Sequence, residues 1–484
     1  MAEEEQLAAV KPPRACRTRD TYTHSSRELN SRRSLKMKCN IFTVFIGSLL
    51  ATWFLATRYI FDMLRPNSKL LTLREKIRGN RHERKSNVAS MALESVVLAT
   101  SAPSQDKNMA LAASAPSHDK NMASATVTPI NCNCSYDVHI FYYGWYGNPR
   151  YDKKWLHWNH VRLPHWNKET AKRYSQTRHI PENNDIGSIY YPSLGMYSSH
   201  DPAVVKDHMK QIRRAGAGVL VVSWYPPNQH DNEGRASDAL IPLLLDKAAG
   251  FGLRVTFHIE PYQKRSAESV KDDLKYIIDT YGRHEAFYRD VKSKLPVIYV
   301  YDSYLISPES WSTILKQESR NSIRKTKYDS IMIGLLVDAK HKEEIKKGGW
   351  DGFYTYFAVD GMTYGSSFQN FHLLRSYADE NNLLFIPSVG PGYDDSPVRP
   401  WNTQNTRDRN DGNYYVNALG FAKRNAKKYI SITSFNEWHE GTNIERAVAG
   451  QIRHDSFGKA YQDYGTHGEN YYLDLTRLML IGMH

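Results

Sequence analysis

The chain has 484 residues, of which 41% are hydrophobic and 12% aromatic, so it can bury a substantial core and wholesale disorder is excluded. The formal net charge is +13, but residues 1–130 contribute +9 of it and the other 354 residues only +4. A nearly neutral body without an RNA- or DNA-binding motif indicates that nucleic acid is not a partner.

The first 130 residues predict a membrane anchor rather than a folded domain. Asn40–Thr57 contains 18 residues without a charge, and the apolar character continues to Phe61. A run of this length can span a bilayer, although a buried core helix has a similar composition. We expect a cytoplasmic tail at 1–39, a transmembrane signal anchor at 40–61 and a luminal stem at 62–130. Basic residues flank the run on both sides, so charge alone leaves its orientation open.

The stem and its end are rich in small polar residues. Ser101–Ala110 recurs almost unchanged as Ser114–Ala123, which is typical of a spacer that does not fold. The sequon at Asn133 fits a luminal body and makes Asn133 a candidate glycosylation site.

Cys132 and Cys134 are too close for an easy bridge to each other, so we expect them to be free or paired between chains. No cysteine follows them, which excludes a cysteine nucleophile in the body.

Residues 131–484 predict a catalytic domain with the α/β fold of a (β/α)8 TIM barrel. Eight apolar runs suit buried parallel strands: 138–145, 219–224, 254–259, 297–301, 331–337, 352–357, 383–389 and 429–435. Helical patterns lie between them, for example at 202–215, 238–250, 267–281 and 367–381, and Asp201 is the expected N-cap of the first. A doubly wound open sheet is the alternative, but no glycine-rich phosphate loop follows the first strand.

Polar and aromatic side chains follow these predicted strands, where the active sites of such barrels lie. The candidates, in chain order, are Tyr146, Trp224, Tyr225, His258, Glu260, Asp302, Tyr356, Trp401, Asn402, Glu437, Trp438, His439 and Glu440.

Glu437 and Glu440 are the strongest candidates for chemistry because both follow the last predicted strand, three residues apart. Cleavage of a glycosidic bond needs an acid that protonates the leaving oxygen and a carboxylate near the positively charged transition state. Two close carboxylates in a partly dry cleft have their pKa values pushed apart, so that one can act as acid and the other as base. A helix-start charge pair is the simpler alternative, but Glu260 and Asp302 at other strand ends argue against it.

Rival chemistries lack part of their motifs. His439–Asn443 begins like a zinc-protease motif, but Asn443 stands where the second histidine is needed. His258–Glu260 resembles the H-x-E of zinc deaminases, but the cysteines that complete that site are missing. The sequence also lacks a nucleophile elbow and a phosphate-binding loop. These observations favour a hydrolase without metal or cofactor.

Nine motifs make a more specific comparison possible. Over about residues 136–477 the sequence resembles glycoside hydrolase family 99, a family of endo-α-1,2-mannosidases. The resemblance rests on 141–149 (FYYGWYGNP), 158–160 (WNH), 185–188 (DIGS), 223–227 (SWYPP), 258–262 (HIEPY), 352–357 (GFYTYF), 385–393 (FIPSVGPGY), 399–407 (RPWNTQNTR) and 431–442 (SITSFNEWHEGT).

The resemblance implies a single-pass type II Golgi membrane enzyme with a luminal catalytic barrel that uses neither metal nor cofactor. The implied substrates are glucosylated high-mannose N-glycans on glycoproteins. They would be cleaved with retention at an internal α-1,2-mannosidic bond, which releases a mannose that carries one to three glucoses. Glu437 is implied as the base on the substrate's 2-hydroxyl, which forms a 1,2-anhydro sugar, and Glu440 as the general acid and then base.

The resemblance also implies contacts with the sugars. Tyr146, Tyr356 and Glu260 would line the subsite of the reacting mannose, and Tyr225 with residues 228–237 would meet the outer glucose. Asn443 replaces the family's glutamine, and the loop at 227–233 departs from the animal pattern, so the outer-sugar preference stays open. A catalytically weak, lectin-like glycan binder is the alternative function. The intact glutamate pair argues against it.

Overall fold

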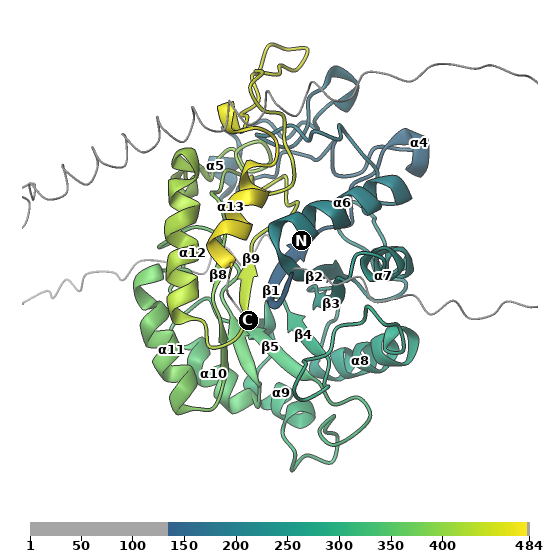
Figure 1. Ribbon diagram of the computed structural model, residues 1–484, viewed down its shortest axis with the longest axis vertical. Coiled ribbons are helices and arrows are strands. Elements are labelled where there is room, and N and C mark those ends of the chain that lie inside the picture. Colours follow the sequence, from purple (N-terminus) through teal and green to yellow (C-terminus); the bar gives the residue numbers. More distant parts are fainter. Residues whose placement is uncertain (1–133, 482–484) are drawn as a thin grey trace, which may run out of the picture. The chain divides into compact units, whose positions relative to one another are not determined.

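The computed structural model describes residues 134–481 (Figure 1). The predicted tail, anchor and stem and the candidate Asn133 lie outside these residues. Within them, no helix combines the length and apolar character needed to cross a membrane. Cys134 is disulfide-bonded, so the expectation of a free thiol is wrong for this residue, and every other cysteine of the chain lies outside the described part.

The strands of the described part form one parallel sheet in the order β7-β6-β5-β4-β3-β2-β1-β9-β8. They are β1 (Ser135–Tyr142), β2 (Ala217–Trp224), β3 (Arg254–Ile259), β4 (Val297–Val300), β5 (Ile331–Leu335), β6 (Gly352–Tyr354), β7 (Leu384–Ile386), β8 (Ser388–Val389) and β9 (Ile430–Ile432). The two ends of this order, β7 and β8, are separated along the chain only by Pro387, whose missing N–H interrupts the strand. The sheet therefore closes on itself and is barrel-like, as predicted.

Each predicted strand overlaps an observed one, although β1 and β2 begin earlier than expected and several strands end earlier. The run at 352–357, for example, supplies only β6, because Tyr356 adopts a φ of 53° and turns the chain away from the sheet. β2 is buried along its whole length, as expected for a parallel strand covered on both faces.

Helices from α6 onward follow the strands and cover the outside of the sheet, whereas α4 and α5 are short helices in the segment between β1 and α6 (Figure 1). They are α4 (Pro149–Asp152), α5 (Lys168–Ala171), α6 (Pro202–Ala215), α7 (Ile241–Ala249), α8 (Ala267–Tyr281), α9 (Pro308–Leu315), α10 (His341–Gly348), α11 (Phe371–Glu380), α12 (Asn413–Asn425) and α13 (Tyr471–Leu480). Short 3-10 turns also occur: η2 (Pro181–Asn183), η3 (Asp238–Leu240), η4 (Ser303–Leu305), η5 (Phe368–Asn370), η6 (Thr403–Asn405), η7 (Asn410–Gly412) and η8 (Gly465–His467).

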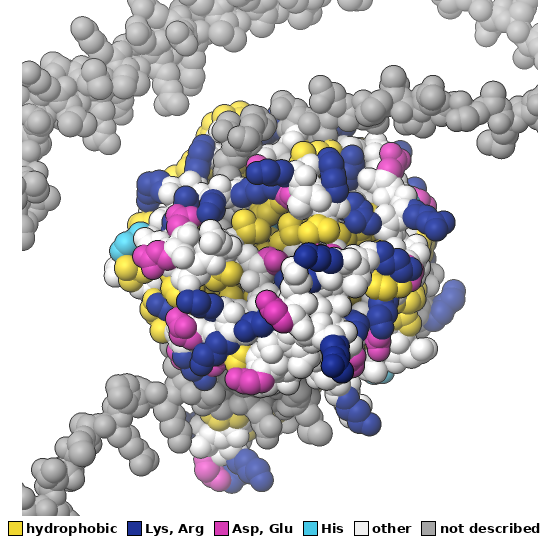
Figure 2. All heavy atoms as spheres, turned by 90° about the horizontal axis from the view of Figure 1, so that it is seen from below, with side chains coloured by type: hydrophobic (Ala, Val, Ile, Leu, Met, Phe, Trp, Pro, Cys, Tyr) yellow, Lys and Arg dark blue, Asp and Glu magenta, His cyan; other side chains and the backbone are white. Residues whose placement is uncertain are grey.

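Local sequence explains the helix boundaries. The predicted N-cap Asp201 accepts a hydrogen bond from the backbone N–H of Ala203, and Gly216 ends α6 in the left-handed conformation. The helices predicted at 238 and 367 begin with η3 and η5 and become α-helical one turn later. On the face shown in Figure 2, cationic and acidic side chains are interspersed, which fits the nearly neutral charge of the body.

Candidate active site

A cavity of about 240 Å3 lies where the chain leaves the carboxyl ends of the strands. Carboxylates, aromatic rings and histidines make up most of its lining. The lining residues are Tyr143, Trp145, His157, His160, Val161, Leu163, Arg178, Tyr225, Asp231, Asn232, Glu233, His258, Glu260, Tyr301, Tyr356, Val398, Arg399, Glu437, His439 and Glu440.

Glu437 is more buried than Glu440, and its side chain is nearly inaccessible to solvent. Its backbone N–H donates to Ser434 Oγ at 2.8 Å, and its Oε1 accepts from the backbone N–H of His439 at 3.0 Å. Burial raises the pKa of Glu437 well above its usual value, and the negative charge of Glu440 raises it further. The first residue of the pair therefore holds a proton more tightly than an ordinary glutamate does.

Two neighbouring elements fix the segment that carries both glutamates. Asn436 exchanges two hydrogen bonds with the backbone of Tyr143, each 2.8 Å long, which ties the end of β9 to the end of β1. On the other side, Arg409 Nη2 donates to the carbonyl oxygens of Gly441 and Asn443, both at 2.8 Å. Asn443 thus takes part in holding the loop through its backbone carbonyl.

Aromatic rings form one wall of the cavity. The hydroxyls of Tyr143 and Tyr356 lie 2.5 Å apart, and the Trp145 ring stacks on His157 with their centroids 4.6 Å apart. Burial and the charge of Glu440 raise the pKa of Tyr356, so its hydroxyl stays protonated and can donate to a ligand. Ring faces of this kind suit the C–H faces of sugars.

The structure brings seven of the predicted site residues together in the cavity: Tyr225, His258, Glu260, Tyr356, Glu437, His439 and Glu440. His258 Nδ1 lies 3.3 Å from Glu260 Oε1, and its Nε2 lies 2.6 Å from the hydroxyl of Tyr354. This contact chain orients Glu260 toward the cavity from the end of β3.

The other six predicted residues do not line the cavity. Three of them lie directly behind its wall or in the core. Tyr146 stacks on Trp158 and accepts from the backbone N–H of Trp438 at 3.0 Å. Trp438 itself is buried, and its indole N–H contacts Tyr197 and Glu445. Trp224 donates to Asp238 Oδ1 at 2.9 Å.

Asp302, Trp401 and Asn402 also have structural partners. Asp302 accepts from the Tyr304 hydroxyl at 2.7 Å, and Trp401 donates to the carbonyl of Leu163 at 3.0 Å. Asn402 donates to the buried Asp395 at 2.9 Å. In this state of the protein these three side chains support the loops around the cavity.

Several lining residues were absent from the predicted set. Tyr143, Trp145 and Arg399 belong to motifs that the sequence showed, so their position after a strand was a usable signal. His160 ends the motif at 158–160, which was also a usable signal, whereas His157 lies just before that motif in an irregular loop after α4, where no sequence pattern indicates which side chains face the cavity.

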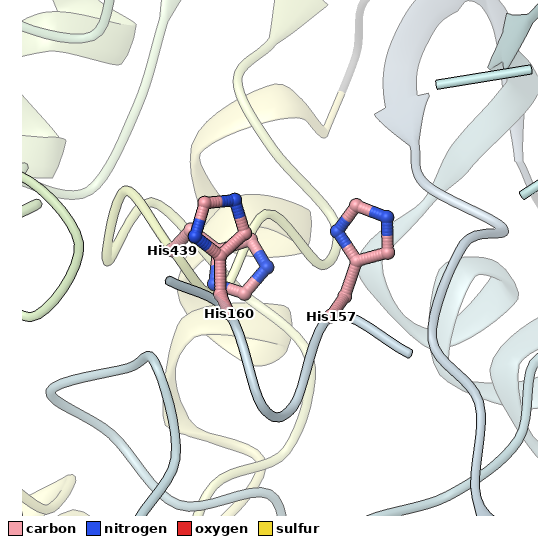
Figure 3. A group of neighbouring side chains, drawn as sticks. All are labelled: His157, His160 and His439. Atoms are coloured by element: carbon pink, nitrogen blue, oxygen red, sulfur yellow. The ribbon is translucent and has the colours of Figure 1, made fainter. Parts of the chain in front are cut away.

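His157, His160 and His439 are the residues that could hold a metal ion, since one ring nitrogen of each lies within 4.8 Å of the other two. Burial lowers the pKa of His439 well below its usual value and that of His160 to about 3, so both rings are neutral at physiological pH. Figure 3 shows the three rings next to one another, two from one loop and one from the segment after β9.

A barrel-like parallel sheet with buried carboxylates beside aromatic rings at its carboxyl-terminal end is the construction of a glycoside hydrolase. The sequence profile described as "Glycosyl hydrolase family 99" matches residues 133–480. The chain belongs to this family.

Relatives and solved structures agree with this assignment. The chain is 52% identical over 346 residues to the "Glycoprotein endo-alpha-1,2-mannosidase" of Rattus norvegicus, covering 71% of this chain and 74% of the relative. It is 49% identical over 344 residues to the "Glycoprotein endo-alpha-1,2-mannosidase-like protein" of Homo sapiens, covering 70% and 74%. The "GH99 endo-alpha-mannosidase from Bacteroides thetaiotaomicron" superimposes with a TM-score of 0.66 at 41% identity, covering 72% of this chain and 97% of that structure.

Proposed function

We propose that the protein is an endo-α-1,2-mannosidase that acts on glucosylated high-mannose N-glycans of glycoproteins and releases a mannose carrying one to three glucoses. The observation that carries this proposal is the pair Glu437 and Glu440 in one cavity, in a chain that belongs to glycosyl hydrolase family 99. The names of its relatives, which share about half of their residues with it, give an internal α-1,2-mannosidic bond in glycoproteins.

The geometry supports separate roles for the two glutamates. Glu437 is the base that removes the proton of the substrate's 2-hydroxyl, whose oxygen attacks the anomeric carbon and forms a 1,2-anhydro sugar. Its raised pKa makes it a stronger base than an ordinary carboxylate. Glu440 donates a proton to the leaving oxygen and later takes one from the water that opens the anhydro ring. In that second step Glu437 returns its proton to the 2-oxygen, so each glutamate ends the cycle as it began.

The cavity also supports contacts with an outer sugar. Tyr225 follows β2, and the loop after it brings Asp231, Asn232 and Glu233 to the same cavity. Asp231 is held there by His157, with Oδ2 and Nε2 3.0 Å apart. We infer that this loop recognises the glucose that precedes the reacting mannose.

We further propose that residues 40–61 anchor the protein in the Golgi membrane as a type II protein, with the catalytic body in the lumen. The uncharged run, the repeated spacer and the sequon at Asn133 support this arrangement. Protease protection of the body in sealed Golgi vesicles, and a mobility shift after removal of N-glycans, would test it.

The decisive experiment compares two glycans on the full-length chain in mild detergent. A Man9 glycan with one terminal glucose should lose a glucosyl-mannose disaccharide, read by mass spectrometry, while glucose-free Man9 should stay intact. Glu440→Gln should lower the rate by about 10²–10⁴-fold and leave glycan binding in place, because the leaving oxygen is no longer protonated. Glu318→Gln, in an exposed loop, is the matched control.

Three results would contradict the proposal. Release of mannose from the glucose-free glycan would show a different specificity. An unchanged rate in Glu440→Gln would remove its role as acid. Binding of both glycans without cleavage by the wild-type chain would make the protein a lectin-like binder.

A further inference from the structure

Three histidines face one another on the cavity wall, and the proposed hydrolysis uses none of them as acid or base. One ring nitrogen each of His157, His160 and His439 lies within 4.8 Å of the other two. His157 and His160 come from a single loop, and His439 comes from the segment after β9 (Figure 3).

The hydrogen bonds of the three rings fix which nitrogen of each can accept. His160 Nδ1 lies 2.6 Å from the carbonyl oxygen of Val161, and His439 Nδ1 lies 2.7 Å from that of Gly187. Because a carbonyl oxygen can only accept, both Nδ1 atoms carry the proton and both Nε2 atoms keep a lone pair. The absence of a side chain at Gly187 matters here, since an added Cβ would lie 3.1 Å from His439 Nδ1.

His157 has the reverse arrangement. Its Nε2 lies 3.0 Å from the carboxylate of Asp231, which leaves Nδ1 as the accepting nitrogen. His157 Nδ1 and His439 Nε2 are both buried and have no hydrogen-bond partner among the described residues. Histidines that bind metals have this pattern, with one nitrogen on the ion and the other donating to a carboxylate or a carbonyl.

We propose that His157, His160 and His439 form a binding site for a divalent transition-metal ion of the Zn2+ type, and that occupancy of this site inhibits the enzyme. Neutral imidazoles suit Zn2+, whereas Mg2+ and Ca2+ prefer oxygen ligands. At Zn–N distances of about 2.1 Å the nitrogens would lie roughly 3.4 Å apart, so from separations of up to 4.8 Å the rings would have to approach by up to about 1.4 Å. His160, which is only half-buried, is the ring with most room to move.

Inhibition follows from the place of the cluster. His439 and His160 line the same cavity as Glu437 and Glu440. Three protein ligands leave a coordination position for water, and a hydrated ion there would occupy volume that the glycan needs. The site therefore couples the activity of the enzyme to the concentration of free transition metal around it.

The test measures binding directly, so that it does not depend on the proposed substrate. The full-length chain, stripped of metal by chelator dialysis, is titrated with Co2+ while its visible absorption is followed, and with Zn2+ against a chromophoric chelator. We expect one ion per chain and a Co2+ spectrum of tetrahedral type. His160→Gln should weaken Zn2+ binding at least tenfold, and Asp231→Asn, which leaves all three ligands in place, by about 10–100-fold. His372→Gln, on an exposed position of α11, is the control and should bind as the wild type does.

Cleavage assays then connect binding to activity. Zn2+ should inhibit the wild-type chain, a chelator should restore the rate, and Mg2+ should have no effect. A wild-type chain without saturable Zn2+ binding, or equal affinity in wild type and both variants, would overturn the site. Binding without loss of activity would overturn the inhibition. Circular dichroism shows whether each variant folds; if His160→Gln does not, Asp231→Asn carries the test.

Discussion

The substitution Arg409→Lys tests how the segment that carries Glu437 and Glu440 is held in place. The guanidinium is buried, and its Nη2 bonds two carbonyl oxygens of the segment that follows Glu440. Its Cζ also lies 4.2 Å from the ring centroid of Tyr190 and 4.4 Å from that of Tyr472. Lysine keeps the charge but presents a single nitrogen on a flexible stem, so it cannot keep both sets of contacts.

The expected cost can be worked out from these contacts. Loss of one charged hydrogen bond costs about 1.5–3 kcal/mol, and weaker contact with the rings adds about 0.5–2 kcal/mol. The free energy of unfolding should therefore fall by about 2–5 kcal/mol, with a decrease in Tm of roughly 3–7 °C for a body of this size. Because the same loop carries both glutamates, we expect kcat to fall by about tenfold or more, since small misplacements of catalytic groups are costly.

Thermal unfolding by circular dichroism and glycan cleavage by mass spectrometry would measure the two effects on the full-length chain. Arg424→Lys, at an exposed position of α12, is the matched control and should change neither. An Arg409→Lys chain with unchanged Tm and kcat would refute the idea that Arg409 holds the loop. A lower Tm with an unchanged kcat would limit its role to the stability of the fold.

Three further predictions concern the scaffold. Asp201→Ala removes the N-cap of α6 and should lower the free energy of unfolding by about 0.5–2 kcal/mol in urea denaturation, whereas loss of no stability would show that the cap contributes nothing. Burial raises the pKa of Asp273 to about 7, so the protonated carboxyl stabilises the protein fully below about pH 4, and this contribution is lost as the pH rises through 7. The free energy of unfolding, measured at several pH values, should therefore fall by up to about 4 kcal/mol over this range, and Asp273→Asn should remove this pH dependence. A Cβ at residue 390 would lie 2.0 Å from the carbonyl oxygen of Thr433, so Gly390→Ala should push on the backbone that leads to Glu437 and lower both Tm and kcat; normal values of both would contradict this close approach.

Much of the scaffold could be predicted because local patterns determine it. Apolar runs located every strand, and Asp201 with Pro202 fixed the start of α6. The ends of the strands were harder to predict, because the chain remains apolar or aromatic as it turns into the cavity. Tyr356, for example, has the composition of a strand residue but a left-handed backbone.

The site could be predicted only where chemistry and strand position agree. Glu437 and Glu440 lie in the segment that follows β9, and both line the cavity. Trp224 also ends a strand, but side chains alternate between the two faces of a sheet, and its ring points to the helices while Tyr225 reaches the cavity. The place of His157 depends on contacts between distant loops, such as its bond to Asp231, which no local pattern encodes.

The closure of the sheet has a consequence for how the protein is made. β1 pairs with β9, and Phe435 donates its backbone N–H to the carbonyl oxygen of Phe141. One edge of β1 therefore has no partner strand until residues almost 300 positions later have been synthesised. Until then β1 has an unpaired edge, and both glutamates are absent from the growing chain. A product truncated before residue 430 would keep that edge exposed and should aggregate rather than persist as an inactive fold. Synthesis of β9 and the segment after it thus both supplies the two glutamates and covers the open edge of β1.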